Sequence, residues 1–138
     1  MSIRAIPLLV FAFILYNLIV LAFGGADAAV SLTKPIFSLT LLSKGTWTFT
    51  WGDFILLVTL VLLFIEIVKS TFSTTSTLID HALSMVVFTA VGMEFLMVPQ
   101  AATSVFFLIL MACLIDVVAG YTIGIRVARR DLNIGADQ

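Results

Sequence analysis

The sequence contains few charged residues. Asp, Glu, Lys and Arg make up only 11% of its 138 residues, whereas soluble domains have about a quarter. Hydrophobic residues make up 62%, and the mean hydropathy is +1.22. This composition predicts an integral membrane protein. Because each span uses roughly 20 residues, we expect one membrane domain over residues 1–138.

Several residue types that carry chemistry are also scarce. Cys113 is the only cysteine, which excludes an internal disulfide and a paired-cysteine metal or redox site. His81 is the only histidine, so a haem with two axial histidines would need a symmetric dimer. The near-neutral net charge of -1 argues against nucleic acid as a partner.

Catalytic signatures are missing from the sequence as well. It has no nucleophile-base arrangement, no glycine-rich phosphate loop and no repeated spacing of metal ligands. We therefore expect no enzyme activity, no catalytic residues, no cofactor and no metal site.

Long apolar segments are what the sequence does contain. The first could be mistaken for a signal peptide, but its apolar run is longer than the 7 to 15 residues typical of such peptides, so we expect it to span. The predicted fold is an all-α bundle of four transmembrane helices. The expected spans are residues 5–23, 54–71, 78–98 and 103–125.

Basic residues near the span ends predict the orientation. Five of them fall on one side of the predicted bundle, against two on the other. Because short cytoplasmic flanks carry the excess of Lys and Arg, both termini are expected in the cytoplasm. The five are Arg4, Lys69, Arg126, Arg129 and Arg130, and the two are Lys34 and Lys44.

The spacing of apolar residues changes in the outer segment between the first two spans. In "TWTFTW", aromatic residues alternate with threonines, which predicts a β-hairpin over about residues 36–51. Gly45 is expected to supply the positive φ of the turn. An open hairpin cannot sit in hydrocarbon, so it should lie on the outer surface. Trp47 and Trp51 are expected to be anchors at the membrane interface, or else part of a hairpin edge that binds a partner.

Two carboxylates lie deep within the predicted spans. At 1.5 Å rise per residue, Glu66 and Asp116 both fall about 5 Å to the cytoplasmic side of the midplane. Charges at such depth are costly and should face the interior of the bundle, an oligomer axis or water. They are expected to hold the second and fourth helices together through a polar contact, or to form a protonatable pair on an ion path.

Three further ionisable residues lie in the third span. Asp80 with Thr77 has the spacing of a capping box, which predicts that it caps the start of the helix. His81 is expected near the cytoplasmic interface. Glu94 is expected near the outer end of the helix, within about 40° of Asp80 around the helix axis.

Small residues recur every fourth position along the last span. Small residues permit close helix contact, so this stripe predicts a face for helix packing or oligomer formation. Its central members are Ala112, Gly120 and Gly124.

The strings "VLLFIEIVK", "IDHALSMVVF" and "IDVVAGYTIGIRVARRD" resemble parts of small four-span bacterial inner-membrane proteins without an assigned function. The resemblance covers about residues 47–131 and implies a bacterial plasma membrane. The layout also resembles claudin-type tetraspan proteins as an architectural analogy. The sequence lacks their tryptophan and paired-cysteine signature in the outer loop.

Together these features predict a non-enzymatic accessory or structural subunit of a membrane complex, or a homo-oligomer, in contact with the lipid bilayer. The alternative is a small oligomeric ion or proton channel or transporter that uses the intramembrane carboxylates. A weaker alternative is an accessory protein that binds a quinone or a lipid next to His81.

Overall fold

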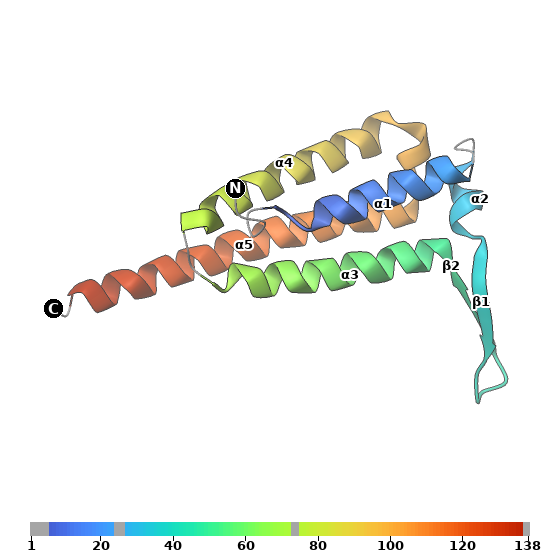
Figure 1. The fold of residues 1–138 in the computed structure, drawn as a ribbon, viewed down its shortest axis with the longest axis horizontal. Coiled ribbons are helices and arrows are strands. Elements are labelled where there is room, and N and C mark those ends of the chain that lie inside the picture. Colours follow the sequence, from blue (N-terminus) through green and yellow to red (C-terminus); the bar gives the residue numbers. More distant parts are fainter. Residues whose placement is uncertain (1–5, 24–26, 73–74, 137–138) are drawn as a thin grey trace.

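A computed structural model describes residues 6–23, 27–72 and 75–136 of the chain. Four long helices of this described part run side by side, and a two-stranded hairpin lies at one end of them (Figure 1). The elements in chain order are α1 (Leu9–Ala22), α2 (Ala28–Leu32), β1 (Pro35–Thr40), β2 (Thr46–Thr50), α3 (Trp51–Ser70), α4 (Thr75–Met97), the 3-10 helix η2 (Pro99–Ala101) and α5 (Ser104–Ala136).

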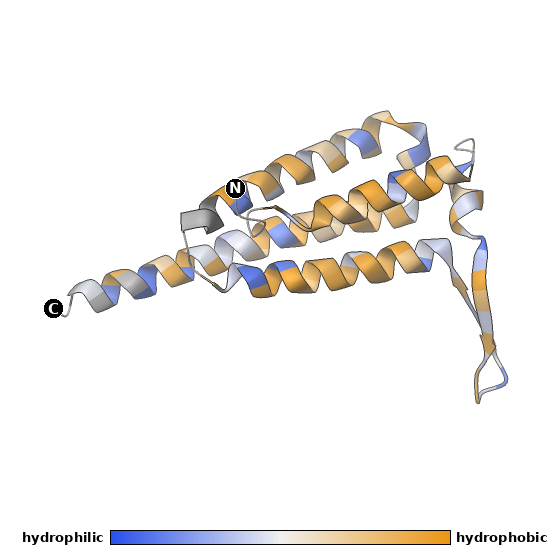
Figure 2. Ribbon diagram, viewed as in Figure 1, coloured by the Kyte–Doolittle hydropathy of each residue, from blue (hydrophilic) through white to orange (hydrophobic). Residues whose placement is uncertain are grey.

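Three helices are long and apolar enough to cross a membrane, namely α3, the Ile79–Met97 part of α4 and the Ser104–Arg130 part of α5. Helix α1 is equally apolar but has only 14 residues, which corresponds to about 21 Å against a hydrocarbon core of about 30 Å. Figure 2 shows apolar residues along all four helices. Hydrophilic residues interrupt α3, α4 and α5 toward the end of the bundle at which α3 finishes.

Helix α1 starts later than the predicted residue 5. Pro7 has no backbone N–H, and the first turn is closed by the amide of Val10 donating to the Pro7 carbonyl at 3.2 Å. Helix α3, in contrast, begins three residues before the predicted 54. Thr50 and Asp53 form a reciprocal capping box there, with the Asp53 amide donating to Thr50 Oγ1 and the Thr50 amide donating to Asp53 Oδ2.

The predicted hairpin is confirmed as a secondary-structure element. Strands β1 and β2 pair in antiparallel fashion, and the register places Phe37 opposite Phe49 and Leu39 opposite Trp47. The turn differs from the prediction, because Lys44, with a φ of 62°, adopts the left-handed conformation in place of Gly45. The Leu41 amide closes the turn by donating to the Gly45 carbonyl at 2.9 Å.

Aromatic rings occupy the core between α1 and α5. The Phe106 ring makes edge contacts with Tyr16 at 4.7 Å and with Phe13 at 6.2 Å between ring centroids, and it stacks against Phe95 of α4 at 6.3 Å. The buried Tyr16 hydroxyl donates to the Gln100 carbonyl at 2.7 Å, so α1 is held to the short connection between α4 and α5.

Helix α5 continues beyond its predicted end at residue 125. It runs on to Ala136, and its last turns extend past the ends of the neighbouring helices (Figure 1). Arg126, Arg129 and Arg130 are exposed on this extension.

Candidate functional site

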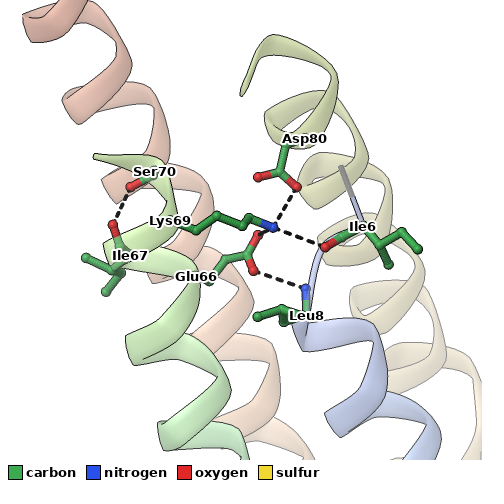
Figure 3. Close-up of polar contacts among 7 residues, drawn as sticks. All are labelled: Ile6, Leu8, Glu66, Ile67, Lys69, Ser70 and Asp80. Atoms are coloured by element: carbon green, nitrogen blue, oxygen red, sulfur yellow. Dashed lines mark hydrogen bonds and ion pairs between the residues drawn. The ribbon is translucent and has the colours of Figure 1, made fainter. Parts of the chain in front are cut away.

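The Lys69 ammonium group is the centre of a polar cluster at the end of the bundle opposite the hairpin. Its Nζ lies 2.8 Å from Glu66 Oε1 and 3.1 Å from Asp80 Oδ1. It also donates to the Ile6 carbonyl at 3.1 Å. Figure 3 shows these groups converging from α3, α4 and the segment before α1. An ammonium group has three N–H donors, and here it faces three oxygen atoms.

Glu66 holds the start of α1 as well as Lys69. Its Oε2 accepts a hydrogen bond from the Leu8 amide at 3.1 Å (Figure 3). The first amides of a helix have no partner within the helix, so a carboxylate from α3 supplies a partner for one of them. Only 2% of Glu66 is exposed. One of its oxygens therefore pairs with Lys69, and the other holds the N-terminal end of α1. We call Lys69, Glu66 and Asp80 together the Lys69 hub.

The sequence predicted Asp80 as a helix cap, and this prediction is wrong. Helix α4 starts at Thr75, so Asp80 lies in its second turn. The Asp80 carboxylate is buried and bound to Lys69. The pairing works because α4 begins at the end of the bundle where α3 finishes, which brings its second turn beside the last turn of α3.

Asp116 of α5 forms the second half of the cluster. Its carboxylate, 5% exposed, interacts with the hydroxyl of Ser84, which lies one turn after Asp80 on α4. No ion pair or hydrogen bond joins Asp116 to Glu66 among the residues that the structure describes. Asp80 instead interacts electrostatically with both carboxylates. The two residues thus belong to one polar region, but each has its own partner.

His81 points toward α5. Its ring stacks on Tyr121 with a centroid distance of 5.8 Å and an interplanar angle of 28°. It also lies over Gly120, where an added Cβ would come within 2.5 Å of Nδ1 and Cε1. The side chain is buried, and in the described part of the chain Nε2 has no hydrogen-bond partner.

The stripe of small residues on α5 is used within the chain. Ala112 and Gly120 are buried, and Gly124 approaches the edge of the His81 ring, with an added Cβ falling 3.6 Å from Nε2. Because His81 of α4 already lies against Gly120 and Gly124, these two positions offer little surface to a second chain. Close helix packing within the chain, one of the two predicted uses, is the one that the structure shows.

The other predicted residues lie at the hairpin end. Glu94 is half-buried near the end of α4 and acts electrostatically on Tyr16. The Trp51 ring, at the first position of α3, contacts the rings of Phe23 at 5.6 Å and Phe54 at 5.9 Å. Trp47 lies on the hairpin and is 45% exposed.

Sequence reasoning missed several members of the cluster. Ser84 is four residues after Asp80, a spacing that places both on one face of a helix, so that signal was present. Tyr121 follows Gly120 directly and carried no comparable signal. The backbone groups of Ile6 and Leu8 could not be found from side-chain patterns at all.

The described residues contain no group of three His, Cys, Asp or Glu side chains positioned to hold a metal ion. A cavity of about 180 Å³ lies at the hairpin end, away from Lys69, and Asp27, Gln100 and Thr103 are among its lining residues. Comparisons with protein-family models, with curated proteins and with solved structures found no match.

Proposed function

We propose that this protein is a non-enzymatic integral membrane protein that serves as an accessory or structural subunit of a membrane complex, or assembles with copies of itself. The observation that carries the proposal is the Lys69 hub. Lys69, Glu66 and Asp80 make contacts that tie α3, α4 and the start of α1 together. Groups used in this way stabilise the bundle, which is the role that a structural subunit requires of them.

The proposed topology has four spans with both termini in the cytoplasm. Its support is the excess of basic residues at the end of the helix bundle where the Lys69 hub lies. The start of α1, the end of α3 and the start of α4 all meet at this hub. The hairpin then lies on the outer surface. The resemblance to bacterial inner-membrane proteins supports the plasma membrane of a bacterium as the location.

Native mass spectrometry after gentle extraction from the native membrane tests the subunit role. A defined complex with other proteins, or a homo-oligomer of fixed number, is the expected result. A protein that is monomeric and free of partners in every mild detergent and in nanodiscs would contradict the proposal.

An ion or proton pathway is the second candidate function, and one specific observation favours it. Glu66, Asp80 and Asp116 are three buried carboxylates, and within residues 6–23, 27–72 and 75–136 Lys69 is the one ammonium group that faces them. Among the described residues, acidic side chains in this region therefore outnumber basic ones, even when His81 is counted as basic. Burying unbalanced charge is costly, so this region favours the uptake of a proton or a cation.

Flux measurements in proteoliposomes separate the two functions. Asp116→Asn removes the charge and keeps an oxygen for Ser84, while Glu94→Gln is a matched control on a half-buried carboxylate at the other end of the bundle. A pathway predicts measurable flux in the wild type that Asp116→Asn abolishes and Glu94→Gln preserves. The structural role predicts no protein-dependent flux, and an assembly that Asp116→Asn destabilises and Glu94→Gln leaves intact.

A further inference from the structure

The hairpin has two chemically different faces. Cross-strand pairing puts Phe37, Leu39, Trp47 and Phe49 together on one side, which we call the aromatic face. The Phe37 ring stacks on Phe49 at 5.0 Å and meets Trp47 edge-on at 6.0 Å between centroids. The opposite side carries hydroxyl groups, and Ser38 and Thr48 hydrogen-bond across the strands at 3.0 Å. A strand pair with this alternation needs an apolar environment on one side only.

The chain itself leaves the aromatic face largely uncovered. All of β1 is exposed, and Trp47 at the centre of the face remains 45% exposed. Leu42 at the tip is completely exposed. Figure 1 shows the hairpin projecting crosswise to the helices, past α3 and away from α1 and α4.

The attachment of the hairpin fixes its level relative to the helices. Strand β2 runs directly into α3, and the Thr50–Asp53 capping box closes this junction. When α3 crosses a membrane, a hairpin that leaves its first residue crosswise lies along the membrane surface. Its outer amides and carbonyls need water or polar partners, which the headgroup layer supplies and the hydrocarbon core lacks.

The charges on this segment match a lipid surface. Lys34 and Lys44 lie before β1 and in the turn, and no Asp or Glu occurs between Asp27 and Asp53. Aromatic residues with cationic neighbours are the composition found where protein meets lipid headgroups, because the rings enter the interface while the ammonium groups meet phosphates.

A second protein is a poorer fit for this face. A fully buried aromatic side chain covers 150 to 250 Å², so four partly exposed side chains offer about 400 Å². A stable protein interface covers about 800 Å² on each partner. A lipid surface sets no such minimum, because the spanning helices already hold the protein in place.

We propose that the hairpin is a membrane-surface arm, with its aromatic face in the headgroup layer of the bilayer that the helices cross. The proposal rests on the membrane placement of α3, α4 and α5 and is independent of the subunit role. The arm widens the footprint of the protein on one leaflet and fixes the height of α3 in the bilayer.

The two tryptophans make the arm directly measurable, since Trp47 and Trp51 are the only ones in the chain. Trp51→Phe leaves Trp47 as the single fluorophore on the arm. The variant is reconstituted in phosphatidylcholine–phosphatidylglycerol vesicles that contain either a headgroup spin-labelled lipid or lipids brominated at defined acyl depths. We expect strong quenching by the headgroup label, weaker quenching by deep bromines, and acrylamide quenching several-fold lower than for free tryptophan in water.

A control variant tests the membrane placement separately. Trp47→Phe, Trp51→Phe and Leu60→Trp together put a single tryptophan at an exposed position midway along α3. Quenching of this tryptophan by deep bromines shows that α3 spans. If it is absent, the membrane placement itself fails.

When deep bromines quench the control variant as expected, two results for Trp47 would contradict the arm proposal without affecting the membrane placement of α3. Trp47 fully accessible to acrylamide and unaffected by the lipid labels means that the arm stands in water. Trp47 shielded from both acrylamide and lipid labels means that a second copy or another protein covers the aromatic face.

Discussion

Gly120 and Gly124 offer a stringent test of the packing between α4 and α5. Both are interior positions of α5, and both face the His81 ring, but at different distances. An alanine Cβ at Gly120 would lie 2.5 Å from Nδ1 and Cε1, which forces the ring or the helix to move. At Gly124 the nearest ring atom would be 3.6 Å away, an ordinary van der Waals contact.

The magnitude follows from the difference between the two variants. Replacing an interior glycine by alanine favours the helix by about 1 kcal/mol in either case, so this contribution cancels. Overpacking in a closely fitted site costs about 1 to 3 kcal/mol. Gly120→Ala should therefore be less stable than Gly124→Ala by about 1 to 3 kcal/mol, measured as the free energy of unfolding in a denaturing-detergent titration.

A His81→Ala background supplies the control for this experiment. Without the ring, Gly120→Ala and Gly124→Ala should have similar effects on the free energy of unfolding. The coupling free energy between positions 81 and 120 should therefore match the difference between the two glycine variants in the wild-type background. Equal effects of the two glycine variants in both backgrounds would refute the placement of His81 against Gly120.

Three further predictions concern other contacts of the fold. Lys69→Met should lower the free energy of unfolding by about 3 kcal/mol, because buried Glu66 and Asp80 lose their counter-charge, whereas Lys44→Met should cost far less; equal losses would contradict the hub. Tyr16→Phe should cost about 1 to 2 kcal/mol and lower the melting temperature, because the hydroxyl bond to the Gln100 carbonyl is lost; an unchanged melting temperature would count against that bond. Lys44→Gly should stabilise the hairpin by about 1 kcal/mol, since glycine adopts positive φ without strain. Hydrogen exchange of the Leu41 amide should slow as a result. Faster exchange would argue against the observed turn.

The apolar runs predicted the long helices, and the alternation of aromatic residues with threonines predicted the hairpin, but the boundaries of these elements depended on local chemistry. The segment beginning at Thr50 has the same Thr-x-x-Asp spacing as the segment beginning at Thr77. Only the first forms a capping box at a helix start, whereas α4 begins before Thr77. Spacing alone cannot distinguish them, because a cap also requires the preceding residues to leave the helix, and β2 provides that at Thr50.

The region in which the buried carboxylates lie was easier to predict than their contacts. Counting residues along each span predicted similar depths for Glu66 and Asp116, and in the structure both carboxylates interact electrostatically with Asp80. The partner of each carboxylate depends on how the helices are rotated about their axes, and the long apolar faces constrain rotation weakly because lipid and core are both apolar. Lys69 could reach Glu66 by helical spacing, but its contact with Asp80 needed the relative position of two helices.

Helix α1 depends on partners that are distant in the sequence at both of its ends. The Leu8 amide is bound by Glu66, 58 residues away, and the Tyr16 hydroxyl is bound by Gln100, 84 residues away. These partners are in place only when α3 and the connection between α4 and α5 have reached their final positions. With 14 residues, α1 is short for a spanning helix, and its first amides need an acceptor wherever water is excluded. We therefore expect α1 to dock last, on a unit formed by α3, α4 and α5, so that a variant without Glu66 would loosen α1 while the contacts between α4 and α5 persist.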